Sequence, residues 1–510
     1  MCAPFIDQEF EFTQPDGTKL KVKGSGNAYR AEFETLDGFT VTRNPETGYF
    51  DYGIEADGVD SVKSSGVPLG SSVPTGIRVS KGLKKRASGF DGVYALSGDI
   101  RPGGRRCDQR RNQKKQFSDF GSFALDSVAA PTAAPPQRQT VGRFVGLTLL
   151  IDFSDQMRTM TEAQVEQFLN APGYSAFGNN GSVRDYFQSV SRGRLDYSNI
   201  VAPWYQASKK LKYYADRGAP YGERARELIE EALQHHITEG LDLTSLTTDD
   251  ANCVYATNVF YAGNRINNWG EGLWPHASYI TAPIELAPGA FAHDYQITDM
   301  TSELTLGTFC HENGHMLCDF PDLYDYDKKE DGIGNGVGYF CLMCFGGGSG
   351  SLATNPIEVG AYLKFAAGWS NVVTKAAAGV QCTLAPASND MLIHRKNDKE
   401  YFLVEARHRA GRDSGLPGSG IALWHVDEAG DNSNEQMTVE RHYECALVQA
   451  DGLFEMERGL SYGEAKDLFQ PGQRFSDLTQ PAANWWDGSP SGFAISTITQ
   501  TGPTYRISLA

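Results

Sequence analysis

The sequence has no excess of positive charge and no long hydrophobic run. Its 510 residues contain 46 lysines and arginines against 63 aspartates and glutamates, which gives a formal net charge of −17. This balance leaves no broad basic surface to meet phosphates, so we expect no nucleic-acid partner. The longest apolar stretch, residues 144–153, is interrupted by Thr148 and Asp152 and is too short to span a bilayer. The sequence therefore predicts a chain without a membrane span.

The sequence also contains few histidines, and no signal peptide is recognisable at its start. The first nine residues lack both the basic region and the apolar core of a signal peptide. Only 10 histidines occur in the chain, so a histidine motif with fixed spacing stands out. The hydrophobic content of 40% is an ordinary globular value. A chain of this length is expected to form about two to four domains.

One such motif, H-E-x-x-H, is formed by His311, Glu312 and His315. On a helix, residues four apart lie on one face, so both imidazoles can bind one zinc ion while Glu312 lies beside the open metal position. Zinc would lower the pKa of a bound water, and Glu312 would take its proton and later pass it to the leaving amine. The alternative is an ordinary amphipathic helix with two surface histidines.

The residues after the motif depart from the metzincin pattern H-E-x-x-H-x-x-G-x-x-H. Cys318 stands at the glycine position, and Pro321, which cannot bind a metal, stands at the third-ligand position. Met343 follows at a distance suited to the methionine turn that forms the floor of such a site. A gluzincin would instead use a glutamate from a later helix, and Glu358 is available. The methionine turn argues against that alternative.

Three segments together resemble the immune-inhibitor-A-type metallopeptidases, which are secreted bacterial enzymes similar to metzincins. They read H-E-x-G-H, then F-P-D-L-Y-D, then L-M-x-x-G-G. The resemblance implies a metzincin-like zinc peptidase domain whose third ligand lies in the Pro-Asp pair, here Asp322. Asp319 is the alternative if the turn is tighter, and Asp325 if it is looser. The resemblance also implies secretion, with a cytoplasmic location as the alternative because no signal peptide is visible.

The order of patterns predicts an α+β multidomain protein with the peptidase domain between two β-rich parts. Residues 1–125 show short strands broken by turn signals and resemble the propeptide of the same family, which implies a prodomain. Residues 126–142 form a linker rich in proline and alanine. Residues 143–370 are the predicted catalytic domain. Residues 371–510 return to strands with period-two alternation, which favours an antiparallel β-sandwich.

Local periodicity within residues 143–370 predicts one buried strand and several helices. The strand covers residues 144–153, where the apolar run is nearly continuous. Apolar residues at helical spacing predict helices at residues 162–169, 182–190, 223–233 and 356–367.

Nine cysteines leave at least one thiol unpaired if the others form disulfides. Four of them crowd the motif region, where they could link the zinc helix to the methionine turn or remain reduced thiols: Cys310, Cys318, Cys341 and Cys344. Cys107 and Cys2 lie in the predicted prodomain. A thiolate is a strong zinc ligand, so either cysteine could block the metal and keep the enzyme latent. Simple steric coverage by the prodomain is the third explanation.

We therefore predict a monomeric zinc endopeptidase that acts on proteins or peptides, is made as a zymogen and is inhibited by its own prodomain. The acidic residues at 325–331 offer oxygen ligands for calcium, although a solvated acidic loop explains them equally well. The rival function is that of a catalytically inactive relative, or of a surface- or carbohydrate-binding protein that keeps the fold. The presence of His311, Glu312 and His315 favours the enzyme.

Overall fold

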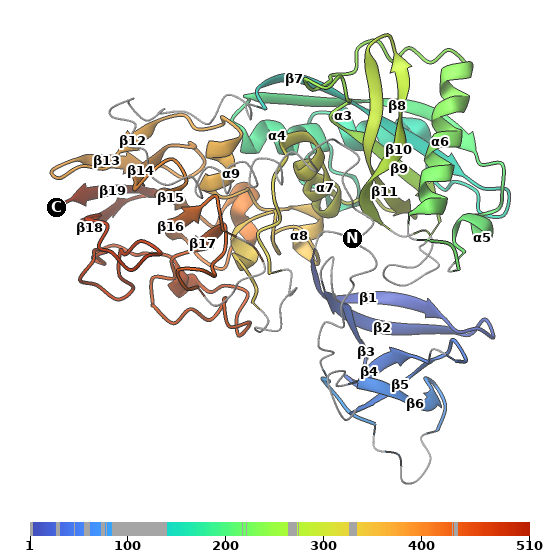
Figure 1. Ribbon diagram of the computed structural model, residues 1–510, viewed down its shortest axis with the longest axis horizontal. Coiled ribbons are helices and arrows are strands. Elements are labelled where there is room, and N and C mark those ends of the chain that lie inside the picture. The colour runs from blue at the N-terminus through green and yellow to red at the C-terminus, as the bar shows by residue number, and fades with distance from the viewer. Residues whose placement is uncertain are drawn as a thin grey trace.

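A computed structural model describes most of the chain outside residues 84–139 and several shorter segments (Figure 1). The described residues are 4–26, 31–44, 46–55, 62–72, 77, 79–83, 140–216, 218–220, 222–263, 273, 275–325, 334–430, 432 and 437–510. Within them, the strands form one N-terminal sheet, one central sheet flanked by helices, and two C-terminal sheets. The protein is thus of the α+β class and consists mostly of strands.

The N-terminal sheet is an antiparallel meander in which each strand pairs with the next along the chain. Turn-forming glycines such as Gly17 and Gly38, both at positive φ, separate the strands. Its strands are β1 (Phe5–Thr13), β2 (Lys19–Gly26), β3 (Ala31–Thr35), β4 (Thr40–Arg43), β5 (Phe50–Glu55) and β6 (Val62–Pro68). This sheet has a small core of its own, made of Phe12, Val22, Val41, Phe50 and Leu69.

The central sheet has the order β10-β11-β9-β7-β8, with β10 antiparallel to β11 and the other neighbours parallel. The strands are β7 (Gly142–Asp152), β8 (Leu195–Gln206), β9 (Thr257–Ala262), β10 (His276–Ala287) and β11 (Ala290–Met300). The strand expected at residues 144–153 is confirmed as β7. Its apolar run is nearly continuous because helices cover both faces of the sheet.

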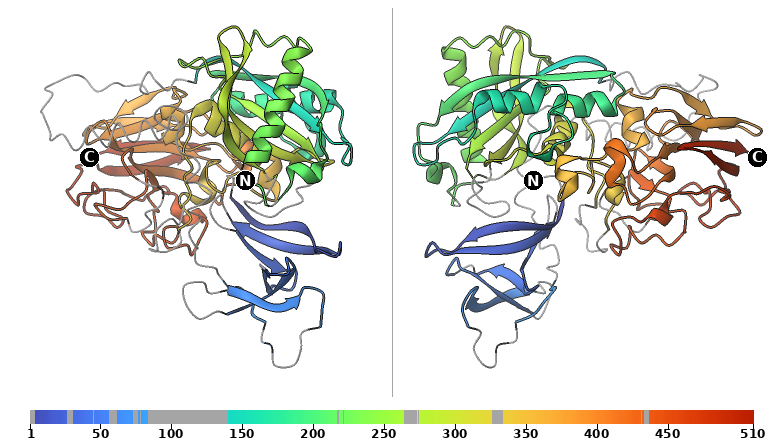
Figure 2. Two further views of the ribbon diagram at one scale, coloured as in Figure 1. Left: turned by 45° about the vertical axis from the view of Figure 1, so that its right-hand side comes forward. Right: turned by 180° about the vertical axis from the view of Figure 1, so that it is seen from behind.

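Helices pack on the two faces of the central sheet (Figures 1 and 2). One core contains residues of α3 (Glu162–Asn170), α4 (Val183–Val190) and α7 (Leu306–Cys318). The other contains residues of α5 (Leu211–Tyr214) and α6 (Glu223–Thr238). Helices α3 and α4 begin at capping boxes, in which Thr161 pairs with Gln164 and Ser182 pairs with Asp185. These local signals explain why the helices expected at residues 162–169 and 182–190 are confirmed.

The C-terminal β module, residues 371–510, contains two sheets that pack on one another. One has the order β12-β14-β15-β16-β17 and the other β13-β19-β18. Their strands are β12 (Val373–Lys375), β13 (Gln381–Leu384), β14 (Met391–Arg395), β15 (Glu400–Arg407), β16 (Gly420–Asp427), β17 (Cys445–Leu447), β18 (Ile495–Thr501) and β19 (Thr504–Leu509). Most pairs are antiparallel, but β12 runs parallel to β14.

Strand β15 is buried along its whole length, and β16 nearly so, rather than buried on alternate residues. On one face Phe402 and Val404 pack against the second sheet. On the other face Leu403 and Trp424 join the same core as helix α7. The C-terminal module therefore has no solvated face at these strands, and it continues the core of the central domain.

The helix expected at residues 356–367 is shorter than predicted, which corrects that boundary. Helix α9 spans Ala361–Ala366, and α8 is a separate turn at Ser351–Thr354. The residues between them run without helix because their amides bond elsewhere: Ile357 N donates to Gly346 O at 3.0 Å and Glu358 N to Asp413 Oδ1 at 3.0 Å. Tertiary contacts, one of them with Asp413 of the C-terminal module, thus override the local helical pattern.

The cysteines in the described part of the chain are buried and stand outside disulfides: Cys253, Cys310, Cys318, Cys341, Cys344, Cys382 and Cys445. Of the two interpretations of the cysteines around the motif, the reduced form is the one that the structure has. Burial raises the pKa of the Cys341 thiol to about 11, so this cysteine is a packing residue rather than a nucleophile. Among the described residues, no helix has the length and apolar character needed to cross a bilayer.

Candidate metal centre

Helix α7 carries the H-E-x-x-H motif and ends in a tight turn that reverses the chain. Asp319 caps the helix in the left-handed conformation, with φ 56°. Phe320 N donates to Gly314 O at 3.1 Å, which fixes the turn against the last helical residues. The same turn brings the following residues back over the face of α7 that presents the histidines.

Three side chains converge on one point beside this turn. Asp322 Oδ1 lies 3.1 Å from His311 Nε2 and 3.1 Å from His315 Nε2. The two Nε2 atoms are 3.1 Å apart. His311, His315 and Asp322 form the group of potential metal ligands found among the described residues, with their donor atoms within 4.8 Å of one another. Two imidazole nitrogens and one carboxylate oxygen are a donor set that suits zinc and leaves a fourth position open.

Backbone carbonyls orient both imidazole rings. His311 Nδ1 lies 3.0 Å from Leu342 O, and His315 Nδ1 lies 2.6 Å from Phe320 O. A carbonyl oxygen can only accept, so each Nδ1 carries the proton and donates it. Each Nε2 is then left with a lone pair directed at the common point, as a metal ligand requires.

The Asp322 carboxylate is held in its charged form. Burial by itself would raise its pKa, but protonated His315 and His311, which would donate to the carboxylate, outweigh burial and bring the pKa well below the usual range for aspartate. When both Nε2 atoms carry lone pairs instead, the charged carboxylate and the two lone pairs form an electron-rich site. This charge pattern favours a divalent cation.

Met343 packs beneath the helix that bears the ligands. A Cβ atom added at Gly314 would lie 2.7 Å from Met343 Sδ, so the glycine allows the thioether to approach the backbone between His311 and His315. Leu323 N donates to Met343 O at 2.7 Å, which ties the same turn to the Asp322 segment. Met343 is fully buried, as the expected floor of the site would be.

Glu312 and the alternative ligands occupy distinct environments. Glu312 follows His311 on α7 and is 2% exposed. Asp319 serves as the helix cap, and Asp325 Oδ2 accepts a hydrogen bond from Tyr443 Oη at 2.9 Å. Glu358 pairs with Arg192 at 2.6 Å and with Lys364 at 2.8 Å. The structure therefore brings Asp322 to the histidines and leaves Asp319, Asp325 and Glu358 out of the ligand group.

Three of the predicted features lie wholly or mostly outside the described residues. They are the latency cysteines, Cys2 and Cys107, the linker, of which residues 126–139 are not described, and residues 326–331 of the acidic segment 325–331 proposed for calcium. All three remain predictions.

A buried polar network beneath α7 was not predicted from the sequence. Asn313, inside the motif, donates through Nδ2 to Asn258 Oδ1 at 2.9 Å and accepts from Tyr197 Oη at 2.6 Å. Gln296 Nε2 donates to the same Asn258 oxygen at 2.9 Å. These bonds connect α7 to strands β8, β9 and β11 and so fix the rotation of the helix on the sheet. Polar residues within otherwise apolar strands, such as Asn258, were the available signal.

A pair of helical histidines, a carboxylate from the following turn and an adjacent buried glutamate define the class of metal-dependent hydrolases. The family model described as immune inhibitor A peptidase M6, catalytic domain, matches residues 281–369. This segment contains the whole ligand group and Met343. Residues 281–369 of this chain are therefore similar to the catalytic domain of the immune-inhibitor-A-type metallopeptidases.

Two curated relatives are similar over a longer stretch. Both are named Pre-pro-metalloprotease PrtV and come from Vibrio cholerae serotype O1, strains M66-2 and ATCC 39315. Each is 25% identical over 269 residues, which cover 43% of this chain and 29% of the relative. The match thus spans less than a third of the length of these relatives.

Proposed function

We propose that this protein is a zinc-dependent endopeptidase of the metzincin-like type. The convergence of His311, His315 and Asp322 on one point, with Glu312 directly after His311 on α7, carries the proposal. Zinc held there would supply Lewis acidity to the attacking water and the scissile carbonyl group. The donor set and the oriented Nε2 lone pairs support zinc rather than calcium or magnesium, which prefer oxygen ligands.

The chain's own residues supply the proton transfers and the positioning. Glu312 accepts the proton of the attacking water and later donates it to the nitrogen of the leaving amine. Leu342 O and Phe320 O hold the two imidazoles in the tautomer that keeps Nε2 free. Asp322 contributes the negative charge that balances a divalent ion. The buried Met343 beneath the motif excludes water from the underside of the site.

The substitution Glu312→Ala tests this assignment. Glu312 is not in the ligand group, so zinc content after mild chelator dialysis should stay at one equivalent while casein hydrolysis falls by about two orders of magnitude or more. Glu303→Ala is the control, because Glu303 is an exposed glutamate just before the same helix. A Glu312→Ala protein with most of its activity would refute the mechanism. An unaltered protein that binds no zinc and cleaves nothing would instead indicate an inactive relative.

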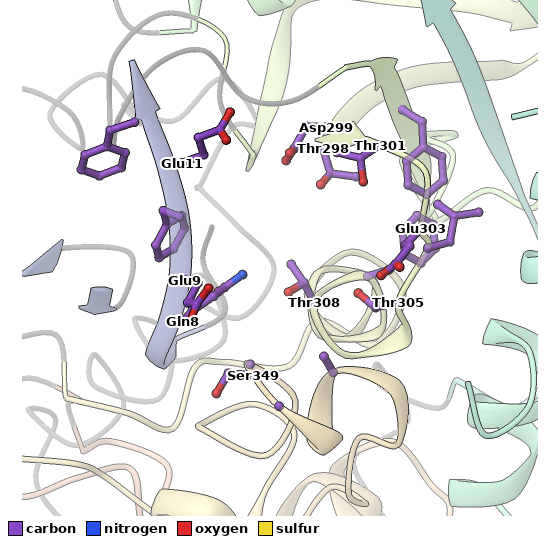
Figure 3. A pocket seen from close by; sticks show the side chains of 18 of the residues that line it. Gln8, Glu9, Glu11, Thr298, Asp299, Thr301, Glu303, Thr305, Thr308 and Ser349 are labelled. Carbon is purple, nitrogen blue, oxygen red and sulfur yellow. The ribbon is translucent and has the colours of Figure 1, made fainter. Parts of the chain in front are cut away.

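We also propose that the enzyme is made as a zymogen and secreted, with residues 1–125 as prodomain. In Figure 3, β1 of the N-terminal sheet faces the start of helix α7 across a cavity of about 980 Å³. Thr308 lines this cavity, and it lies four residues before Glu312 and therefore on the same helical face. The name of the PrtV relatives, a pre-pro form, is consistent with such processing. Steric coverage near α7 supports latency whether or not Cys2 or Cys107 reaches the metal.

A further inference from the structure

The loop between β16 and β17 of the C-terminal module contacts the segment that carries Asp322. Asn432 Nδ2 donates a hydrogen bond to the backbone oxygen of Asp322. Tyr443 Oη donates to Asp325 Oδ2 at 2.9 Å. Both aspartates and both donors are buried, with Tyr443 only 1% exposed. Two side chains more than one hundred residues away in sequence therefore bond to the two ends of residues 322–325.

The residues that follow this segment are held by the same module. Asn335 N donates to Met456 O at 2.8 Å, and its side chain donates to Ser461 O at 2.9 Å. Arg407 Nη1 donates to Phe340 O at 2.9 Å, directly before the turn that contains Met343. The described residues from Asp322 to the methionine turn are thus bonded repeatedly to residues beyond 400.

The three ligands differ in what fixes them. His311 and His315 lie on a helix that the central sheet holds, and carbonyls orient their rings. Asp322 lies in a stretch without regular structure, residues 319–325. A ligand on irregular backbone reaches its position only if outside contacts hold that backbone, and hydrogen bonds behind the ligands are what tunes metal affinity.

We propose that Tyr443 and Asn432 are positioning residues that preorganise Asp322 for the metal, so that the metal centre is completed by the C-terminal module. This inference rests on the proposed metal site. Neither residue is a ligand: Tyr443 acts through Asp325 and Asn432 acts through the Asp322 carbonyl. We therefore expect that weakening these bonds lowers the affinity for zinc without removing any ligand.

The test compares two Tyr→Phe variants of the full chain by competition for zinc against a chelator. Tyr443→Phe keeps the ring and removes the bond to Asp325, and we expect the zinc dissociation constant to rise about tenfold. Tyr401→Phe is the matched control, because Tyr401 is also buried in this module and its hydroxyl donates at 2.9 Å to Glu428 Oε1, which is not part of residues 319–325. The metal-free proteins should lose similar amounts of thermal stability.

Asn432→Ala provides a second route to the same answer, with an expected weakening of zinc binding in the same range. Equal zinc affinity in Tyr443→Phe, Tyr401→Phe and the parent chain would overturn the proposal. Equal weakening in both tyrosine variants would also overturn it, since the effect would then be a general loosening. His315→Ala tests the proposed metal site separately from the positioning role of Tyr443 and Asn432. If this variant keeps its zinc, the metal site itself is wrong. If it loses its zinc, the metal site stands and the tyrosine and asparagine variants decide the positioning role.

Discussion

The two β-rich parts of the molecule are attached to the central domain in different ways (Figure 2). The N-terminal sheet has its own small core and approaches the body where Pro4 O lies against Gly348. A cavity of about 980 Å³ is lined by residues of β1 and of the body. The C-terminal module instead shares a continuous core with helix α7, and Trp424 packs directly on Gly360.

This difference predicts that removal of the two strand-rich parts has different consequences for the central domain. A part with a separate core and a loosely filled interface exposes little of the remaining core when it leaves, here the contact made by Ile6. A part whose strands are buried on both faces cannot leave without exposing apolar surface of the central domain. The attachment of the N-terminal sheet is compatible with the proposed removable prodomain, whereas the C-terminal module shares its core with helix α7.

Truncation should give the largest effect. A chain of residues 140–510 is expected to unfold in one cooperative transition, because its core remains complete. A chain of residues 140–370 is expected not to fold, because it loses Leu403 and Trp424 from the core around α7. Thermal unfolding followed by circular dichroism distinguishes the two. A cooperative transition in the 140–370 chain would show that the C-terminal module is separable after all.

Removing one buried charge should break the attachment of the C-terminal module without truncation. The Arg407 side chain is 1% exposed and lies 2.7 Å from Asp413 and 3.4 Å from Glu405. Arg407→Met would leave the Asp413 carboxylate buried without its cationic partner, whereas Glu405 keeps Lys364 at 3.0 Å, so we expect a loss of about 3–5 kcal/mol in the free energy of unfolding by urea.

Arg409→Met is the control for this change, because Arg409 is an exposed arginine two residues away. Its effect should stay within about 0.5 kcal/mol. If the Arg407 and Arg409 variants were equally stable, the buried ion pairs would not contribute to holding the module in place.

Sequence patterns predicted the parts of the fold that depend on neighbouring residues. Residues 144–153 and the helices with capping boxes follow from local spacing, and the structure has them. The helix expected from residue 356 is wrong at its start because Glu358 N bonds to Asp413 Oδ1 and Gly360 meets the Trp424 ring. Both contacts join positions more than forty residues apart, which periodicity does not record.

The candidate site shows the same limit. His311, Glu312 and His315 could be found from spacing alone, because one helix fixes all three. Asp322 needed the family resemblance, since a turn of unknown tightness also permitted Asp319 or Asp325. Tyr443 and Asn432 gave no local signal, because their roles arise only when the C-terminal module packs on the ligand segment.

Matched core truncations sharpen the comparison between the two parts. Phe12→Ala opens the N-terminal core and should destabilise that sheet by about 3 kcal/mol. It should leave the main unfolding transition of the body unchanged. Leu403→Ala, in the core shared with α7, should lower the main transition instead, by about 2–5 kcal/mol. Hydrogen exchange resolved by segment measures both, and an effect of Phe12→Ala on protection of α7 would contradict the separation.

The smallest effect is expected at Glu457, a buried acid of the C-terminal module. Its substitution tests whether this module unfolds together with the body. Burial raises the pKa of Glu457 to about 7 from 4.5, and the nearby Asp467 adds repulsion. Below pH 4.5 this group is neutral in both the folded and the unfolded chain. As the pH rises from 4.5 to 7, only the unfolded chain ionises freely, so the free energy of unfolding falls.

Glu457→Gln removes this ionisation and keeps an amide that can still bond to Gln449. The variant should match the parent near pH 4.5 and exceed it by about 1–3 kcal/mol at pH 8. The gain should appear in the main transition, which includes helix α7, because the core is continuous. Calorimetry at the two pH values tests this expectation. A gain confined to a separate, smaller transition would mean that the C-terminal module melts on its own.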